Sequence, residues 1–384
     1  MPLSRRALDI PPFHVMELLR RARELERQGR DIIHMEVGEP DFPTAAPIIE
    51  AATRFVAAGD VHYTPAQGLP ELREAIARFY QQRFGADVAP ERIVITPGAS
   101  GALMLALAVT TDPGDEWLLA DPGYPCNRQL VRSFEGVARA LPVDAAQRFQ
   151  PTAEAVAAAW SARTRGLMVA TPSNPTGTLL APGEVARLHA AVDARGGTLI
   201  VDEIYQGLTY GIESSTALAR FDDIFVVNSF SKYFGMTGWR LGWLVAPTDY
   251  VREVEKLAQH FFIAASTPAQ HAALAAFTPE TLDILEARRE AFAERRTTLL
   301  PALRELGFTV AAEPQGAFYV YADVAALAED SEALARRFIE EAGVATTPGL
   351  DFGDHLPRRH LRLAYTTSRG RLLEAVDRLA RVLA

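Results

Sequence analysis

Cysteine and lysine are both scarce in this chain of 384 residues. Cys126 is the only cysteine, so the chain can form neither an intrachain disulfide nor a zinc site built from several thiolates. Lys232 and Lys256 are the only lysines, while arginine is abundant. Any chemistry that requires a lysine amine must therefore use one of these two residues.

Long apolar runs are absent as well. The longest, residues 102–109, is far shorter than the roughly 18 residues that a membrane span requires. The first six residues include two arginines, but no apolar stretch follows them as it would in a secretory signal. We therefore expect a soluble, cytoplasmic protein that does not bind membranes.

Positive charge is in deficit, since 39 Lys and Arg oppose 48 Asp and Glu and give a net charge of −9. A broad, positively charged surface for binding nucleic acid is therefore not expected.

Several catalytic motifs are also missing. No Gly-x-Gly-x-x-Gly follows an expected strand, no glycine precedes either lysine as in a Walker A loop, and neither His-Glu-x-x-His nor Gly-x-Ser-x-Gly occurs.

Short apolar runs alternate with helical patterns through the middle of the chain. Such alternation predicts βαβ units and an α/β fold with a mainly parallel, buried sheet. The seven expected strands are residues 92–96, 116–120, 137–141, 167–171, 198–201, 224–228 and 241–246. The helices expected between them include residues 100–109, 152–160 and 182–194.

The two ends of the chain predict further elements. Apolar spacing predicts helices over 13–28 and 70–83, and a long helix from about Thr278 that stops at Gly307, with Pro301 as a candidate kink. A smaller α/β domain follows, with expected strands 317–321, 344–347 and 360–365 and helices 332–341 and 369–382. We expect an N-terminal arm with part of the small domain (1–45), a large domain (46–280) and a small C-terminal domain (281–384).

Four loops at the ends of expected strands hold unusual residue sets. They are residues 97–100, 172–177, 202–205 and 229–240. In open α/β sheets, ligands bind beyond the carboxyl ends of parallel strands, so these loops are expected to converge on one edge.

Two of these loops offer donors for a phosphate. Gly98, Ala99 and Ser100 open a helix directly after a strand, where backbone N–H groups and the helix dipole favour an anion, although loop statistics alone favour a simple tight turn. The other loop offers donors on the residues Ser229, Ser231 and Arg240.

Lys232 and Asp202 are the candidates for acid–base chemistry. Lys232 lies between hydroxyl residues in a loop between buried strands, and a lysine held there near other cations has a lowered pKa, as an amine nucleophile requires. Lys256 follows Glu253 by three residues and is expected on an ordinary charged helix face. Asp202 ends a buried strand and is either a structural cap or ion pair, or the carboxylate that keeps a heterocyclic nitrogen protonated.

Together these loops supply a lysine nucleophile, a phosphate site and a carboxylate for a ring nitrogen, with Asn174 and Tyr205 as further donors. These are the groups that pyridoxal 5′-phosphate (PLP) requires.

From Gly38 to its C-terminus, the chain resembles the class I and II aminotransferases of PLP-dependent fold type I, the aspartate aminotransferase-like superfamily. The resemblance rests on the order and spacing of seven motifs. They are Gly-Glu-Pro-Asp-Phe (38–42), Tyr-Thr-Pro (63–65), Asn-Pro-Thr-Gly (174–177), Asp-Glu-Ile-Tyr (202–205), Ser-Phe-Ser-Lys (229–232), Gly-Trp-Arg (238–240) and His-Leu-Arg-Leu (360–363).

The resemblance implies a role for each matching residue. Lys232 would form a Schiff base with the cofactor and move a proton, and Asp202 would pair with the pyridinium. Asn174 and Tyr205 would bond the cofactor phenolate. The residues implied against the ring and phosphate are Tyr124, Gly98, Ala99, Ser100, Ser229, Ser231 and Arg240.

The resemblance also implies a homodimer with shared active sites, since Tyr63 would reach the phosphate of the neighbouring subunit. Arg362 would clamp the substrate carboxylate with help from Asn174 and the backbone of Gly38. Without the resemblance, a buried strand arginine such as Arg362 is expected in a structural ion pair.

The resemblance implies transamination between an L-amino acid and a 2-oxo acid such as 2-oxoglutarate or pyruvate, by a ping-pong mechanism. Bacterial aspartate aminotransferases of the family often carry a basic residue at the position of Ser100. Serine cannot neutralise a distal carboxylate, so neutral or aromatic donors are expected in preference to aspartate.

Two alternatives remain open. A carbon–sulfur β-lyase of the same fold needs the same cofactor residues. A non-catalytic ligand-binding regulator would usually carry an appended DNA-binding module, and Gly38 lies too near the N-terminus to leave room for one.

Overall fold

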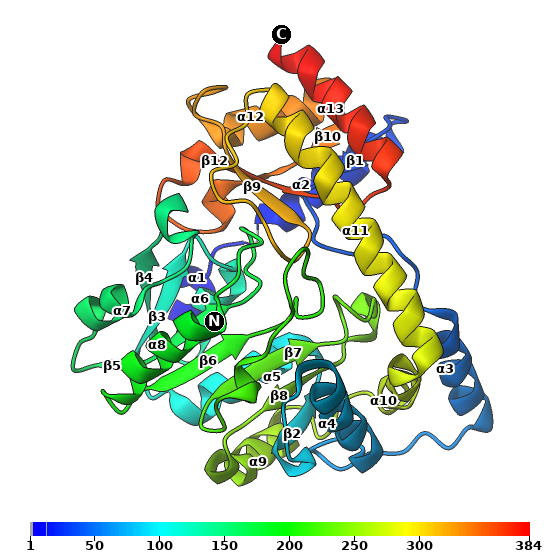
Figure 1. The fold of residues 1–384 in the computed structure, drawn as a ribbon, viewed down its shortest axis with the longest axis vertical. Helices are drawn as coiled ribbons and strands as arrows, with labels where there is room; N and C mark the ends of the chain where they lie inside the picture. Colours follow the sequence, from blue (N-terminus) through cyan, green and yellow to red (C-terminus); the bar gives the residue numbers. More distant parts are fainter. Residues whose placement is uncertain (1–2, 13) are drawn as a thin grey trace.

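A computed structural model describes residues 3–12 and 14–384, and its main layer is a seven-stranded sheet (Figure 1). The strand order is β2-β8-β7-β6-β5-β3-β4, and all neighbours are parallel except β8, which runs antiparallel to β2 and β7. The strands are β2 (Ile93–Thr96), β3 (Glu116–Asp121), β4 (Val137–Pro142), β5 (Thr164–Ala170), β6 (Thr198–Asp202), β7 (Phe225–Ser229) and β8 (Gly242–Val245). The predicted α/β class with a mainly parallel seven-stranded sheet is confirmed.

Alternate residues of the central strands enter two different cores, as expected for a sheet covered on both faces. In β6, Leu199 and Val201 pack into one cluster while Ile200 packs into the other. The helices over the Ile200 face are α5 (Gly98–Thr110), α6 (Pro125–Ser133) and α9 (Val251–Phe261). Those over the opposite core are α3 (Ala46–Ala58), α4 (Pro70–Phe84), α7 (Ala153–Ala159), α8 (Pro182–Asp193) and α10 (Thr267–Leu274).

A second, smaller group of strands is joined to the main layer by the long helix α11 (Pro279–Glu305), which runs along one side of the molecule in Figure 1. Here β9 (Tyr319–Asp323), β12 (His360–Ala364) and β11 (Thr347–Pro348) form an antiparallel sheet. The first strand of the chain, β1 (Ile33–His34), pairs with β10 (Val344–Ala345). The surrounding helices are α1 (Arg5–Asp9), α2 (His14–Arg27), α12 (Ser331–Arg337) and α13 (Arg369–Leu383).

Short helical turns complete the secondary structure. Phe338–Ala342 forms a π-helical turn directly after α12. The 3₁₀ turns are Pro90–Arg92, Ala145–Gln147, Ala217–Ala219, Thr237–Trp239, Thr248–Tyr250, Ala275–Phe277, Gly349–Asp351 and Pro357–Arg359.

The smaller sheet differs from the sequence prediction in two places. The strand expected at 317–321 begins only at Tyr319, because Ala317 has a φ of 55° and its N–H bonds the carbonyl of Leu208 in a loop. The strand expected at 344–347 divides into β10 and β11, which belong to different sheets. Helix α11 continues through Pro301, and the predicted first residue of α2, Phe13, lies outside the described residues.

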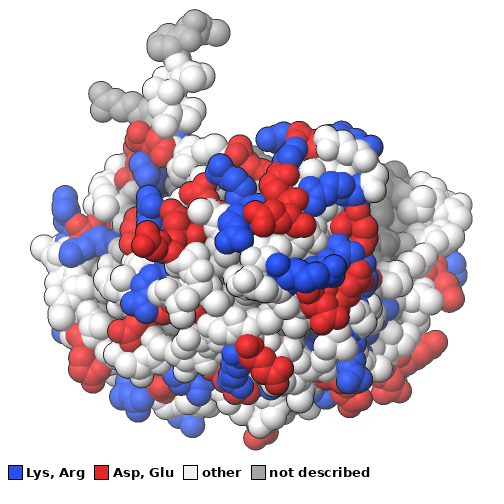
Figure 2. Space-filling view, turned by 90° about the horizontal axis from the view of Figure 1, so that it is seen from above, with Lys and Arg blue, Asp and Glu red and all other residues white. Residues whose placement is uncertain are grey.

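Charges of both signs are mixed on the surface. Figure 2 shows basic and acidic side chains interspersed over the face seen from above, without a broad patch of one sign. Lys256 lies on α9 in an ion pair with Glu253, as predicted. Within residues 3–12 and 14–384, no helix is long and apolar enough to cross a membrane.

The segment that follows Gly38 is fastened to α11 by a partly buried ion pair. Both terminal nitrogens of the Arg295 guanidinium donate to the Asp41 carboxylate, at 2.7 and 3.0 Å. The Arg295 guanidinium carbon also lies 4.8 Å from the ring centroid of Phe42, and Phe42 packs edge-on against Phe292 at 5.5 Å. These contacts hold Gly38 in a defined position relative to the main sheet.

We expect Arg295→Met to lower the free energy of unfolding by about 2 kcal/mol, because Asp41 loses its charged hydrogen-bond partner. The urea midpoint measures the change. Arg369→Met is the matched control, since Arg369 pairs with Glu294 at 3.1 Å with both side chains more than half exposed, and it should cost less than about 1 kcal/mol. Equal losses in the two variants would contradict the assigned anchor.

Candidate active site

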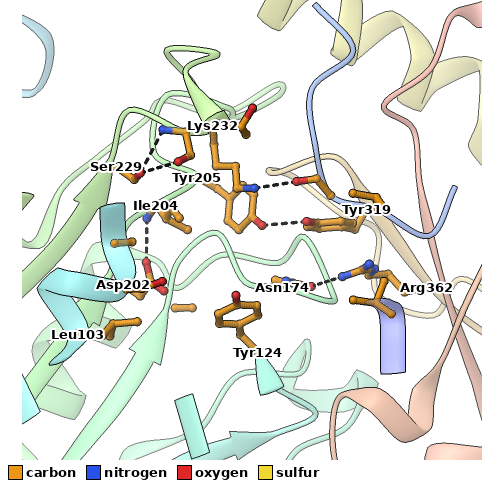
Figure 3. Close-up of a pocket in the computed structure, with 18 of the residues that line it drawn as sticks. Leu103, Tyr124, Asn174, Asp202, Ile204, Tyr205, Ser229, Lys232, Tyr319 and Arg362 are labelled. Atoms are coloured by element: carbon orange, nitrogen blue, oxygen red, sulfur yellow. Dashed lines mark hydrogen bonds between the residues drawn. The ribbon is translucent and has the colours of Figure 1, made fainter. Parts of the chain in front are cut away.

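A cavity of about 230 Å³ lies beyond the carboxyl ends of β5, β6 and β7, against the N-terminus of α5. Figure 3 shows Asp202 and Ser229 on one side of this cavity and Tyr319 and Arg362 on the other. The main sheet therefore supplies one wall and the smaller sheet supplies the opposite wall.

Most of the residues singled out in the sequence line this one cavity. They are Gly38, Ala99, Ser100, Tyr124, Asn174, Asp202, Tyr205, Ser229, Ser231, Lys232, Arg240 and Arg362. Gly98 lies just behind the wall, where a Cβ atom would come within 2.6 Å of an Arg240 nitrogen. Tyr63 does not line the cavity, and 81% of it is exposed in the single chain.

The cavity is lined by three cations and one carboxylate. The cations are Lys232, Arg240 and Arg362, and the carboxylate is Asp202. Across the described part of the chain, none of the three cations has a carboxylate oxygen within ion-pair distance. Arg362 is buried, and a buried charge normally has a partner, so this excess of positive charge fits an anionic ligand.

Lys232 follows β7 and points across the cavity. Its Nζ donates to the carbonyl oxygen of Gly38 at 2.7 Å. Burial is the main cause that lowers the pKa of Lys232 to about 8; the positive charges of Arg362 and Arg240 act in the same direction, and the negative charges of Glu39 and Asp202 oppose them. The neutral, nucleophilic form of this amine is therefore far more populated at neutral pH than that of an ordinary lysine.

Asp202 ends β6, and its carboxylate accepts the backbone N–H of Ile204 at 3.0 Å. Burial raises the pKa of Asp202 to about 6, although this hydrogen bond and the charge of Lys232 oppose the change. Among the described residues no cation forms an ion pair with Asp202, so the structural ion pair considered from the sequence is absent. A cationic ligand atom facing Asp202 would favour its ionised form.

The donors expected for a phosphate lie close together at the start of α5. Ser229 donates to the Ser231 hydroxyl at 3.0 Å, and Arg240 lies against the first turn of α5 at Gly98. Arg240 has a φ of 52°, a left-handed conformation that costs a non-glycine residue about 1 to 2 kcal/mol. Two hydroxyls, a guanidinium and a helix N-terminus together suit a phosphate.

Arg362 lies on β12 and is 4% exposed. Its guanidinium donates to Asn174 Oδ1 at 3.0 Å, to Thr347 Oγ1 at 3.2 Å and to the carbonyl of Glu36, and its buried Nε has no hydrogen-bond partner. The ion pair expected of an ordinary buried arginine is not found around it in the described residues. The unused Nε–H group is therefore available to donate a hydrogen bond to the carboxylate of a ligand.

Several wall residues were not predicted from the sequence. Tyr319 comes from β9, Val15 and Met16 come from α2, and Leu103 and Ile204 add apolar surface. Only tertiary structure brings β9 and α2 to this cavity, although Ile204 lies within a motif already singled out. In the described residues no group of three or more His, Cys, Asp or Glu side chains is placed to hold a metal ion.

Comparison with known proteins gives one consistent result. The family model described as "Aminotransferase class I and II" matches residues 30–379. A valine–pyruvate aminotransferase of Mycobacterium tuberculosis is 39% identical, with 96% of each chain covered. An aspartate/prephenate aminotransferase of Thermus thermophilus is 37% identical, with 99% of this chain and 98% of the relative covered.

Solved structures agree with these relatives. An aminotransferase from Mycobacterium tuberculosis superposes with a TM-score of 0.96 at 38% identity, covering 100% of this chain and 99% of the other. The aspartate aminotransferase of Thermus thermophilus with maleate gives a TM-score of 0.93 at 35% identity, with both chains covered completely.

The lowered pKa of Lys232 can be tested by chemical labelling of the ligand-free protein. In a Lys256→Arg background, reductive methylation followed by mass spectrometry should show that the Lys232 peptide reaches half-maximal reactivity near pH 8. Arg362→Met should move this midpoint to higher pH, because a neighbouring positive charge that disfavours the charged amine is removed. An unchanged midpoint in that variant would show that Arg362 does not act on Lys232.

Proposed function

Because the chain belongs to the class I and II aminotransferase family, we propose that it transfers the amino group of an L-amino acid to a 2-oxo acid with PLP held in the described cavity. The single observation that carries this proposal is the cavity lined by three unpaired cations and one buried carboxylate. The two substrates would react in turn, in a ping-pong sequence.

The residues present fit PLP at each end of the cavity. Arg240, Ser229, Ser231 and the N-terminus of α5 would hold the phosphate, and Asp202 would face the ring nitrogen. When bound, PLP supplies an electron-withdrawing ring that stabilises negative charge on the substrate α-carbon. A protonated ring nitrogen would also favour the ionised form of Asp202, whose pKa burial raises to about 6.

Other wall residues would orient the ring. The Oδ1 atom of Asn174 accepts from Arg362, which leaves its Nδ2 group as the donor toward the ring oxygen. Tyr205 would donate to the same oxygen, and the Tyr124 side chain would lie against the ring face.

Lys232 would supply the amine for covalent attachment of the cofactor and would then carry the proton of the substrate α-carbon. An amine with a pKa near 8 can both accept and return a proton at neutral pH. The hydrogen bond from its Nζ to the Gly38 carbonyl supports this role, because Gly38 belongs to the proposed substrate site.

Arg362 would bind the substrate carboxylate through its unused Nε donor, with Asn174 and the backbone of Gly38 beside it. The remaining wall is apolar where Val15, Met16 and Leu103 contribute. Each of the three cations already has a role, so this chain has none left in the described wall for a second substrate carboxylate. We therefore propose neutral or aromatic donors, in line with the name of the valine–pyruvate relative.

We also propose a homodimer in which Tyr63, largely exposed in one chain, reaches the phosphate site of its partner. The proposed domain division, with a boundary near residue 280, is supported by the start of α11 there and by the pairing of β1 with β10.

The cofactor proposal is tested by the absorbance spectrum of PLP-reconstituted protein before and after addition of single L-amino acids. We expect conversion of the cofactor band to that of the pyridoxamine form. Lys232→Ala should retain some PLP but lose turnover by roughly a thousandfold or more, whereas Lys256→Ala, the only other lysine variant, should be unaffected.

Three results would contradict this proposal. Loss of all PLP on desalting would favour a non-catalytic protein, and undiminished turnover in Lys232→Ala would refute the assigned nucleophile. Pyruvate release from a cysteine conjugate, without the pyridoxamine band, would favour the β-lyase.

Donor preference is tested by kcat/KM for alanine, phenylalanine and aspartate. We expect aspartate to be at least tenfold poorer, because its second carboxylate would be desolvated without a cation. Ser100→Lys should raise the aspartate value selectively, since Ser100 lines the cavity, and Ser133→Lys at the end of α6, which does not line it, is the control. An aspartate value above both of the others would refute the preference.

A further inference from the structure

Tyr319 contacts both Tyr205, on the proposed cofactor side of the cavity, and Arg362, on the proposed substrate side. It belongs to none of the motifs found in the sequence. It is the first residue of β9 and pairs in register with Ala364 of β12, close to Arg362 on the same strand. Its side chain lines the cavity but is only 1% exposed. Its surroundings are therefore set by packing rather than by solvent.

The hydroxyl of Tyr319 lies 2.9 Å from that of Tyr205 (Figure 3). Burial raises the pKa of both phenols, so both keep their protons at neutral pH. Each hydroxyl has one proton to donate, and only one of the two can occupy the line between the oxygens. If Tyr319 donates, the Tyr205 proton is directed elsewhere, toward the cavity.

The ring of Tyr319 supports the substrate side. The guanidinium carbon of Arg362 lies 4.5 Å from its centroid and 4.8 Å from that of Phe352. These aromatic faces hold the cation without satisfying its hydrogen-bond donors, and the Nε group stays unused. The support therefore does not compete with a substrate carboxylate.

A third contact connects Tyr319 to the lysine. A Cβ atom at Gly38 would lie 1.7 Å from the Tyr319 hydroxyl oxygen, so only glycine allows this approach. The carbonyl of Gly38 in turn accepts the hydrogen bond from Lys232. One side chain thus contacts the segments that carry Tyr205, Arg362 and Gly38.

We propose that Tyr319 is a positioning residue: its hydroxyl donates to Tyr205 and so directs the Tyr205 O–H at the ring oxygen of the cofactor, while its ring holds Arg362 in place for the substrate carboxylate. This inference rests on the proposed function. A hydroxyl that accepts a hydrogen bond is also a stronger donor, so loss of the Tyr319 hydroxyl weakens the contact that Tyr205 makes.

The test is a pH titration of the cofactor absorbance in PLP-loaded protein without substrate. Tyr319→Phe should raise the titration midpoint by about 0.5 to 1 unit, because the deprotonated cofactor loses stabilisation worth about one hydrogen bond. Tyr205→Phe should raise it further, and the double variant should match Tyr205→Phe, because Tyr319 acts through Tyr205.

Tyr321→Phe is the matched control. Tyr321 lies two residues further along β9 and is 2% exposed, but it does not line the cavity. Its titration should equal that of the wild type. A wild-type midpoint in Tyr319→Phe, with a shift in Tyr205→Phe, would overturn the inference and leave the proposed function intact. No shift in either variant would also overturn it, whereas no cofactor band in the wild type would mean that the proposed function itself fails.

The ring contact is tested separately by KM and kcat. Tyr319→Phe keeps the ring, so KM for the amino donor should stay within twofold of the wild type. Tyr319→Leu should raise that KM by roughly three- to tenfold, because the cation–π support of Arg362 is lost. An equal KM in the Phe and Leu variants would refute the role of the ring.

Discussion

The cavity depends on positive charge that the protein itself does not neutralise. Lys232, Arg240 and Arg362 line one cavity, and within the described chain none of them has a carboxylate partner. Elsewhere the buried Arg295 is paired with Asp41, whereas the buried Arg92 donates to the backbone carbonyls of Ala246 and Asp222. An anion in this cavity would face all three cations, so their shared location is the strongest indication of an anionic ligand.

The two sheets supply different residues to the cavity. The main sheet supplies the ends of β6 and β7, which carry Asp202 and Ser229, and the smaller sheet supplies Arg362 and Tyr319. Gly38 lies between them, held by Lys232 on one side and approached closely by Tyr319 on the other. A ligand that engages both walls would therefore couple the two sheets, which the long helix α11 also connects.

The sequence predicted the part of the site that local patterns encode. Lys232, Asp202 and Asn174 each follow or end a strand of the main sheet, so parallel-strand topology places them together. Tyr319 could not be found this way, because its importance comes from contacts with Tyr205 and Gly38, which are more than a hundred residues away. For the same reason β10 and β11 were expected as one strand, since the partners that separate them, β1 and β12, are distant in sequence.

Burial shifts the pKa values of Lys232 and Asp202 in opposite directions. It lowers the pKa of Lys232 to about 8 and raises that of Asp202 to about 6, so both charged forms are disfavoured in the free protein. A ligand with a phosphate at Arg240 and a cationic nitrogen at Asp202 changes the two sites separately. The phosphate offsets the charge of Arg240, which otherwise lowers the pKa of Lys232, and the nitrogen favours the Asp202 carboxylate. A single molecule with both groups would therefore counteract both pKa shifts, whereas a simple anion or a simple cation would counteract only one of them.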